Sequence, residues 1–216
     1  MNLDELKAIQ SELSQRVRLT PFSGPVRHVA GCDVSYNRIK NEMTAVVAVM
    51  EYPSLRLIEI ASHTARVEFP YIPTFLSFRE LPSLLEAFKK VKIRPELIVV
   101  DGQGIAHPRK LGIAAHFGVT VGIPTIGCAK SHLFGEYVMP GEKRGEWKPL
   151  LDKNGDVIGA VVRTRDRVKP VFISPGHLID VKSSVEWILK LTKGFKLPEP
   201  IRFADSISRR ISHEGI

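Results

Sequence analysis

The sequence has very little cysteine: Cys32 and Cys128 lie far apart in the chain, and no CxxC pair is present. This usage excludes a zinc site built from cysteine pairs and indicates free thiols in a reducing compartment. The opening residues, MNLDELK, lack the apolar core of a secretory signal. We therefore expect a cytoplasmic protein.

Long hydrophobic runs are also missing. The longest stretch without Asp, Glu, Lys or Arg covers residues 111–129, and four glycines, Pro124 and His116 interrupt it. A membrane-spanning helix needs about 20 predominantly apolar residues in a row. The sequence therefore predicts that the protein has no membrane segment.

Acidic side chains are outnumbered by basic ones, 23 against 31, which gives a net charge of +8 on 216 residues. Such a surplus favours polyanions through counterion release, so nucleic acid is the first candidate partner and an anionic membrane surface the second. Charge alone leaves open a simple role in solubility. Hydrophobic residues make up 44% of the chain, which is enough for one core. We expect a single domain over residues 1–216, acting as a monomer.

Hydrophobic periodicity predicts an alternation of strands and helices. The first helix begins at Leu3, where Asn2 and Glu5 can form a capping box. The expected strands are 28–36, 43–51, 55–68, 97–100, 124–129, 157–163 and 170–174; the expected helices are 3–17, 81–91, 109–117, 183–193 and 200–211; residues 131–155 are expected to be irregular. The first three strands suit an antiparallel meander, and the last two suit a hairpin. This order indicates an α/β fold with a mixed sheet.

Three carboxylates give the strongest chemical signal. Asp33 lies within an otherwise apolar strand, Asp101 follows the short strand 97–100, and Glu80 lies at the start of the helix between them. If those strands are neighbours, Asp33 and Asp101 meet at a strand end, where ligand sites of α/β sheets gather. Two desolvated carboxylates need a cation or a shared proton, and oxygen-only ligands favour Mg²⁺ or Mn²⁺. The alternative is three unrelated surface and turn carboxylates.

Two loops offer candidate contacts to a ligand. The prolines of Phe69–Pro73 stiffen the backbone around Tyr71, and a rigid aromatic side chain can act as a wedge between base steps. A packed proline-rich turn is the alternative. The glycines of Asp101-Gly102-Gln103-Gly104 allow a ligand to approach the backbone, although no Walker or dinucleotide-binding pattern is present. An ordinary strand-to-helix turn is the alternative there.

Several basic residues carry weaker signals. Lys130 follows the strand 124–129, where its ammonium group could contact a phosphate or simply be solvated. His177 is an isolated histidine at a strand end, and no Ser-His-Asp order or GxSxG turn indicates a hydrolase triad. The alternating residues Arg163, Arg165, Arg167 and Lys169 would form a phosphate-binding ridge if they were extended, or a solvated hairpin tip.

These features occur in a specific order along the chain. The stretches are VAGCDVSY (29–36), EYPSL (51–55), FPYIPTFLSFRELP (69–82), VVDGQGIAHPRKLGIAAHFG (99–118), IPTIGCAKSHLFG (123–135), ISPGHLIDV (173–181) and LPEPIRFAD (197–205). Together they resemble the endonuclease V family, the deoxyinosine 3′ endonucleases. The resemblance implies a ribonuclease-H-like fold and a Mg²⁺-dependent nuclease, with Mn²⁺ as a substitute, that recognises deaminated adenine in DNA. Such enzymes cut the second phosphodiester bond 3′ to the lesion and leave 3′-hydroxyl and 5′-phosphate ends.

The resemblance also implies roles at the catalytic centre. Asp33 and Asp101 match metal-binding aspartates, and Glu80 matches a third acidic residue of the active site. Lys130 matches a lysine near the scissile phosphate. Asp205 falls where family members place a fourth acidic or imidazole group.

Other matches concern the recognition of the substrate. Tyr71 matches a wedge tyrosine that supports the strand opened at the lesion. The turn Gly102–Gly104 matches a pocket wall that reads the flipped base through backbone groups. His107 and His177 fall at family positions without an assigned chemical step.

Other functions remain open at the level of sequence. Another ribonuclease-H-like nuclease, such as a cutter of RNA:DNA hybrids or junctions, would explain the carboxylates but not PYIP or DGQG. An inosine-specific ribonuclease is a related alternative. A non-catalytic binder of damaged nucleic acid gains nothing by placing acids beside phosphates, and no cofactor motif supports a metabolic enzyme.

Overall fold

The computed structural model describes residues 2–214 and begins with helix α1 (Leu3–Ser14). Asn2 accepts a hydrogen bond from the Glu5 backbone and Glu5 accepts one from the Asn2 backbone, which confirms the predicted capping box. The helix ends before the predicted residue 17. The chain then crosses the molecule toward α4 (Val181–Lys190), where the Phe22 backbone N–H donates to Ser183 Oγ at 3.0 Å.

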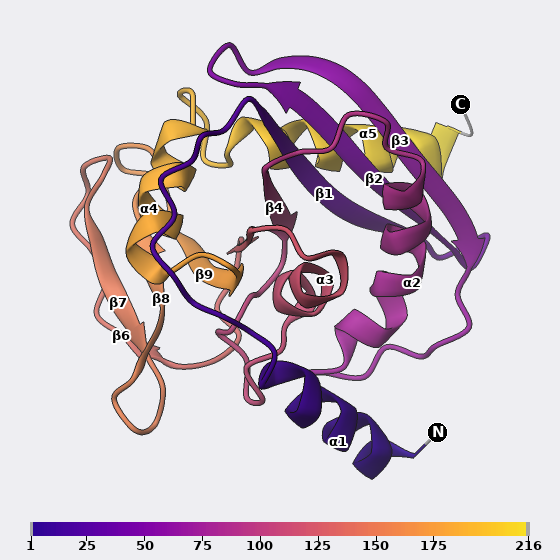
Figure 1. Cartoon of the computed structure of the whole chain (residues 1–216), viewed down its shortest axis with the longest axis horizontal. Helices are drawn as coiled ribbons and strands as arrows, with labels where there is room; N and C mark the ends of the chain where they lie inside the picture. The colour runs from indigo at the N-terminus through magenta and orange to yellow at the C-terminus, as the bar shows by residue number, and fades with distance from the viewer. Residues whose placement is uncertain (1, 215–216) are drawn as a thin grey trace.

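Within residues 2–214, nine strands form one mixed sheet in the order β3-β2-β1-β4-β5-β9-β8-β7-β6 (Figure 1). They are β1 (His28–Asn37), β2 (Glu42–Glu51), β3 (Arg56–Arg66), β4 (Leu97–Asp101), β5 (Thr125–Ala129), β6 (Glu136–Tyr137), β7 (Trp147–Leu151), β8 (Val157–Val162) and β9 (Val171–His177). The predicted β1–β2–β3 meander and the β8–β9 hairpin are confirmed. β4 joins β1 in parallel, and β5 joins β4 in parallel.

Helices cover both faces of this sheet (Figure 1). The remaining ones are α2 (Leu76–Lys89), α3 (Ile113–Val121) and α5 (Glu199–Glu214). α2 and α3 pack on the face that carries Ile98 and Val100 of β4, whereas α4 and α5 pack on the face that carries Leu97 and Val99. Burial on both faces explains why β4 is apolar from Leu97 to Val100. The result is the predicted α/β, ribonuclease-H-like mixed sheet flanked by helices.

A close backbone contact seats α5 on the sheet. Gly31 of β1 lies directly under Pro200, and a Cβ atom at Gly31 would lie 1.9 Å from the Pro200 carbonyl oxygen. Only glycine permits this approach. This contact therefore fixes where α5 lies on β1, at a point about one and a half helical turns before Asp205.

Three local predictions were wrong. α2 begins at Leu76 instead of residue 81, because its first turn is held by His116, whose Nδ1 lies 3.1 Å from Ser77 Oγ. α3 covers 113–121 instead of 109–117, because hydrogen-bonded turns occupy residues 107–112. The segment 131–155 contains β6 and β7, whose largely exposed side chains give little periodic signal.

None of the helices described between residues 2 and 214 combines the length and the apolar character that a bilayer crossing requires.

Candidate active site

Alternation along the strands decides which side chains meet α5. Asp33 shares a face of β1 with Val29, and Asp101 shares a face of β4 with Val99; both valines belong to the core under α4 and α5. In the parallel β1–β4 pair Cys32 is opposite Val100, so Asp33 and Asp101 follow at neighbouring positions, at the carboxyl end of β4 and just past the part of β1 that pairs with β4. The expectation that Asp33 and Asp101 meet is confirmed.

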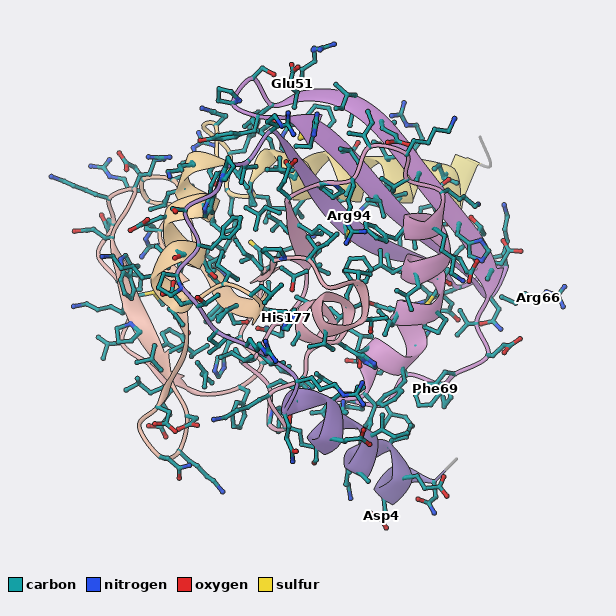
Figure 2. All side chains as sticks on the ribbon, in the orientation of Figure 1. Asp4, Glu51, Arg66, Phe69, Arg94 and His177 are labelled. Atoms are coloured by element: carbon teal, nitrogen blue, oxygen red, sulfur yellow. The ribbon has the colours of Figure 1, made fainter. Side chains whose placement is uncertain are left out.

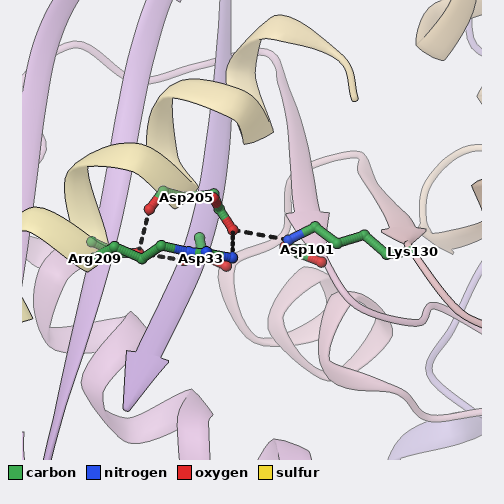
Figure 3. A network of polar contacts seen from close by, with 6 residues as sticks. Asp33, Asp101, Lys130, Asp205 and Arg209 are labelled. Atoms are coloured by element: carbon green, nitrogen blue, oxygen red, sulfur yellow. Dashed lines mark hydrogen bonds and ion pairs between the residues drawn. The ribbon is translucent and has the colours of Figure 1, made fainter. Parts of the chain in front are cut away.

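Asp205 of α5 completes an acidic cluster at this edge. One carboxylate oxygen from each of Asp33, Asp101 and Asp205 lies within 4.8 Å of the other two. Lys130, which follows β5, lies between two of them: its Nζ is 2.9 Å from Asp101 Oδ2 and 2.8 Å from Asp205 Oδ1 (Figure 3). Arg209 also contacts Asp205 Oδ1, at 2.9 Å. The cluster is therefore partly neutralised by two basic side chains.

Asp33 is the most buried member of the cluster, with 9% of its surface exposed. Burial, together with the charges of Asp101 and Asp205, raises its pKa to about 6, although a hydrogen bond from Ser208 Oγ opposes the shift. Asp101 and Asp205 hold Lys130 in its charged form and raise the pKa of its ammonium group. The site thus has a carboxylate that gains from a nearby cation and a lysine that stays protonated.

Glu80 approaches from α2, on the opposite face of the sheet. Burial raises its pKa to about 8, and the negative charges of Asp33 and Asp101 contribute to the shift. Glu80 is therefore electrostatically linked to both aspartates, unlike an isolated surface glutamate.

The donor set fits a hard divalent cation. Three carboxylates converge at one point, all of them oxygen donors, and the like charges of Asp101 and Asp205 raise the pKa of Asp33. A cation would relieve this repulsion, and carboxylate oxygens are the ligands preferred by Mg²⁺ and Mn²⁺. The acidic cluster can therefore bind a metal ion.

Two of the residues predicted to contact substrate, Tyr71 and Gln103, line one small pocket. Thr74, His107 and Leu133 also contribute to its lining. Tyr71 is 66% exposed, so its ring is not packed into the core. Gly102, with φ of +146°, occupies a backbone region that favours glycine. The Gly104 backbone N–H donates to Ser174 Oγ at 2.7 Å, which fixes the turn against β9.

His107 and His116 are both buried and neutral. Burial lowers the pKa of each to about 4. In His107 the Nε2 atom faces the Thr74 carbonyl oxygen at 2.9 Å and Nδ1 accepts the Arg109 backbone N–H at 3.1 Å. A carbonyl oxygen cannot donate and an amide N–H cannot accept, so these partners require the neutral tautomer protonated at Nε2.

We expect stability to fall as the pH drops from about 6.5 to about 4 because of these two histidines. The unfolded chain binds their protons at higher pH than the folded chain, so stability present above pH 6.5 is lost toward pH 4, on the order of 1–3 kcal/mol per histidine. Urea unfolding of wild type and His116→Gln at pH 7.5 and pH 5.0 measures the effect. The glutamine variant should lose less stability over this range; equal losses in both proteins would contradict the prediction.

His177 lies away from the acidic cluster. In the antiparallel β5–β9 pair it is beside Thr125, at the opposite end of β5 from Lys130. Its Nδ1 accepts the Arg18 backbone N–H at 3.2 Å, and Figure 2 shows it beside the N-terminal segment. The structure thus gives His177 an anchoring contact instead of a place at the cluster.

The alternating basic residues do not form an extended ridge; the alternative, a solvated tip between two strands, holds for three of the four. Residues 163–170 form a loop between β8 and β9, and Arg167 has a positive φ. Arg163 is buried, and its guanidinium donates to the carbonyl oxygens of Gly141, Val168 and Pro140. Arg165, Arg167 and Lys169 are exposed, but without the extended backbone that would align them with Arg163.

The sequence did not predict two residues that contact the acidic cluster, Ser208 and Arg209. Both follow Asp205 by about one helical turn, so the periodicity of α5 could have indicated that they lie on the same side as Asp205. Nothing local indicated that Ser208 would contact Asp33, which is in the first strand.

Comparisons with known proteins agree with this geometry. A family model described as Endonuclease V matches residues 11–206. Endonuclease V of Geotalea uraniireducens is 47% identical over 99% of this chain and 90% of its own. The crystal structure of endonuclease V from Streptomyces avermitilis is similar with a TM-score of 0.93 at 40% identity, over 99% of this chain and 94% of that one.

A further structure contains nucleic acid. Ciona intestinalis endonuclease V in complex with a 24mer DNA containing an inosine followed by a ribo-adenosine is similar with a TM-score of 0.85 at 26% identity, over 99% of both chains. The acidic cluster and these relatives together indicate a hydrolytic nuclease. The similarity extends over nearly the whole chain. The chain belongs to the endonuclease V family.

Proposed function

We propose that this protein is a DNA repair endonuclease that recognises deoxyinosine and hydrolyses the second phosphodiester bond on its 3′ side. The observation that carries the proposal is the convergence of Asp33, Asp101 and Asp205 within 4.8 Å in a chain of this family. The net charge of +8 and the inosine-containing DNA bound by the Ciona relative support a nucleic-acid substrate.

Asp33 and Asp101, with Asp205 beside them, would hold Mg²⁺, and Mn²⁺ would be an acceptable substitute. When bound, such an ion lowers the pKa of a coordinated water and neutralises charge on the transferring phosphate. Hydrolysis then leaves a 3′-hydroxyl and a 5′-phosphate end.

Two further side chains belong to the catalytic centre. The ammonium group of Lys130 stays protonated beside Asp101 and Asp205, where it faces the non-bridging oxygens of a phosphate bound at the cluster. Glu80 is the third acidic residue of the centre: burial and the charges of Asp33 and Asp101 raise its pKa to about 8, so a cation held at the cluster would favour its ionised form.

Recognition takes place in the pocket beside the cluster. The flipped base enters next to Gln103 and is read by backbone groups of the Gly102–Gly104 turn, while Tyr71 supports the opened strand. Extrusion requires the least free energy for a poorly paired base such as hypoxanthine. His107 lines this pocket without taking a chemical step.

The decisive experiment uses a labelled duplex with one deoxyinosine, incubated with and without Mg²⁺. We expect a single Mg²⁺-dependent nick at the second phosphodiester bond 3′ to the lesion. A matched duplex with adenine at the same position is the control. Cleavage without a divalent ion, or equal cleavage of both duplexes, would contradict the proposal.

The Tyr71→Ala variant should recognise the lesion poorly while retaining its metal site. We expect kcat/KM on the inosine duplex to fall by ~10-fold or more, because the opened strand loses its aromatic support. Affinity for Mn²⁺, measured by electron paramagnetic resonance, should stay within about twofold of wild type, because Tyr71 is not in the acidic cluster. Phe195→Ala, which removes another exposed aromatic ring, is the control. Unchanged discrimination between inosine and adenine by Tyr71→Ala would count against the wedge.

Inosine-containing RNA is a second candidate substrate. The DNA bound by the Ciona relative carries a ribo-adenosine after the inosine, which shows that this relative accommodates a ribonucleotide at that position. Rates on matched DNA and RNA strands with one inosine each would rank the two substrates.

A further inference from the structure

We propose that Gln10, His107 and Arg109 form a clamp on Thr74 that holds the Tyr71 arch (residues 69–73) in the position needed for substrate recognition. The three are positioning residues: they act through the backbone of the arch and not on the reacting groups. The assignment of the arch to DNA rests on the proposed function, whereas the clamp itself rests on contacts within the chain.

Thr74 is the residue at which the arch joins α2. Its φ is +67°, a left-handed backbone conformation that β-branched side chains rarely adopt. Such a conformation persists only where surrounding contacts impose it. The next residue completes the turn, since the Phe75 backbone N–H donates to the Ile72 carbonyl at 3.0 Å. The orientation of the arch therefore depends on what holds Thr74.

Three donors converge on the carbonyl oxygen of Thr74. Gln10 Nε2 lies at 2.8 Å, His107 Nε2 at 2.9 Å and Arg109 Nη2 at 3.2 Å. Arg109 Nη2 also contacts Thr74 Oγ1 at 2.6 Å. Thr74 thus has three donors on its carbonyl oxygen and a further contact on its hydroxyl group, so its backbone is far more constrained than that of an ordinary loop residue.

The clamp residues are themselves locked. Gln10 is fully buried, and its Oε1 accepts a hydrogen bond from Arg109 Nε. The Arg109 guanidinium lies over the ring of Phe75, 4.6 Å from its centroid. His107 is buried and neutral, with its second ring nitrogen bound to the Arg109 backbone. Donors from α1 and from the turn after β4 therefore reach Thr74 in fixed directions.

The clamp connects the arch with the base pocket. Thr74 and His107 line that pocket together with Tyr71 and Gln103. On the other side, the Arg79 guanidinium lies 6.0 Å from the Tyr71 ring and 4.6 Å from the Tyr36 ring. The exposed Tyr71 thus makes few core contacts of its own. Phe69, at the start of the arch, packs with its ring centroid 6.3 Å from that of Phe78, and the groups that bind Thr74 hold the other end of the arch. Loosening Thr74 would displace the wedge relative to the pocket without touching the acidic cluster.

The double variant Gln10→Leu/Arg109→Met tests the clamp. The two substitutions remove the donor and the acceptor of the Arg109–Gln10 hydrogen bond together, so neither group is left buried without the other. We expect amide hydrogen exchange of Phe75, whose N–H donates to the Ile72 carbonyl across the turn, to accelerate by ~10-fold. On duplex DNA with one inosine, KM should rise by ~10-fold with kcat within about twofold. A single-stranded inosine substrate, which needs no strand separation, should be cleaved at close to the wild-type rate.

Two further variants separate positioning from general destabilisation. Arg163→Met removes a buried guanidinium that also donates to three backbone carbonyls, but these belong to Pro140 and Gly141 before β7 and to Val168 after β8. This variant should lower the melting temperature of the protein. It should leave unchanged the amide hydrogen exchange of Phe75 and the KM for duplex DNA with one inosine. Thr74→Asn, introduced into the double variant, should restore part of the arch protection, because asparagine adopts the left-handed conformation more readily than threonine.

The outcomes separate the clamp from the proposed function. The clamp would be overturned if the double variant kept both the wild-type rate of amide hydrogen exchange of Phe75 and the wild-type KM on duplex DNA. It would also be overturned if the double variant lost equal activity on the duplex and the single-stranded substrates. If the wild-type protein itself shows no preference for inosine, the proposed function fails. The amide hydrogen exchange of Phe75 would still decide whether Gln10 and Arg109 hold the arch.

Discussion

Neither Asp33→Asn nor Asp101→Asn is expected to nick inosine-containing DNA at more than ~10⁻³ of the wild-type rate in Mg²⁺, equivalent to about 4 kcal/mol of lost transition-state stabilisation. Each change removes one anionic oxygen from a cluster in which three carboxylates lie within 4.8 Å. Asparagine keeps the shape of the side chain, so the loss of cleavage would result from the removal of the negative charge. Alanine at either position should likewise abolish cleavage.

Asp33→Asn should at the same time stabilise the metal-free protein. Burial and the neighbouring aspartates raise the pKa of Asp33 to about 6, so its ionised form is unfavourable in the folded chain at neutral pH. A neutral amide removes this repulsion, which we expect to raise the free energy of unfolding by about 1–2 kcal/mol. A variant that is more stable and inactive would identify Asp33 as a functional carboxylate.

The measurements are single-turnover cleavage in Mg²⁺, DNA affinity without metal and thermal unfolding without metal. DNA affinity should stay within about threefold of wild type, because the basic surface is unchanged. Asp4→Asn, at an exposed position in α1, is the matched control and should cleave normally. Near-normal turnover by either active-site variant would disprove the assignment.

Gly31→Ala is expected to damage the catalytic centre from a distance. The new Cβ would lie 1.9 Å from the carbonyl oxygen and 2.1 Å from the carbonyl carbon of Pro200, both backbone atoms that cannot rotate away. α5 would have to shift on β1, which moves Asp205 relative to Asp33 and Asp101. We expect a loss of about 2 kcal/mol in stability and, because displacements near 1 Å are felt strongly in catalysis, ~10²-fold in kcat/KM.

The control for this variant is Gly155→Ala in the turn between β7 and β8. Gly155 has φ of +81° and no neighbouring atom within 4 Å of an added Cβ, so alanine there should cost about 1–2 kcal/mol through backbone strain alone. Mn²⁺ affinity and cleavage should be unchanged in Gly155→Ala and weakened in Gly31→Ala. Wild-type Mn²⁺ affinity in Gly31→Ala would show that the contact between Gly31 and Pro200 does not position the acidic cluster.

The sequence by itself determined most of the sheet and part of the site. Apolar alternation and short links predicted the β1–β2–β3 meander, and the continuous apolar run of β4 predicted a strand buried on both faces. The same patterns placed Asp33 within a strand and Asp101 at the end of one, and period-two alternation together with a parallel register brings them to one face. These features are local, so the residues themselves carry the signal.

Only the tertiary structure decided the rest. Asp205 and Ser208 reach Asp33 because Gly31 lets α5 approach β1, and no pattern within either segment indicates that contact. Arg163 is buried instead of lining a ridge because carbonyl oxygens of a distant loop bind it. α2 begins early because His116 of α3 holds its first turn, and Thr74 is held by donors from α1 and the turn after β4. Each of these depends on groups far apart in the chain, whose proximity arises only when the helices pack onto the completed sheet.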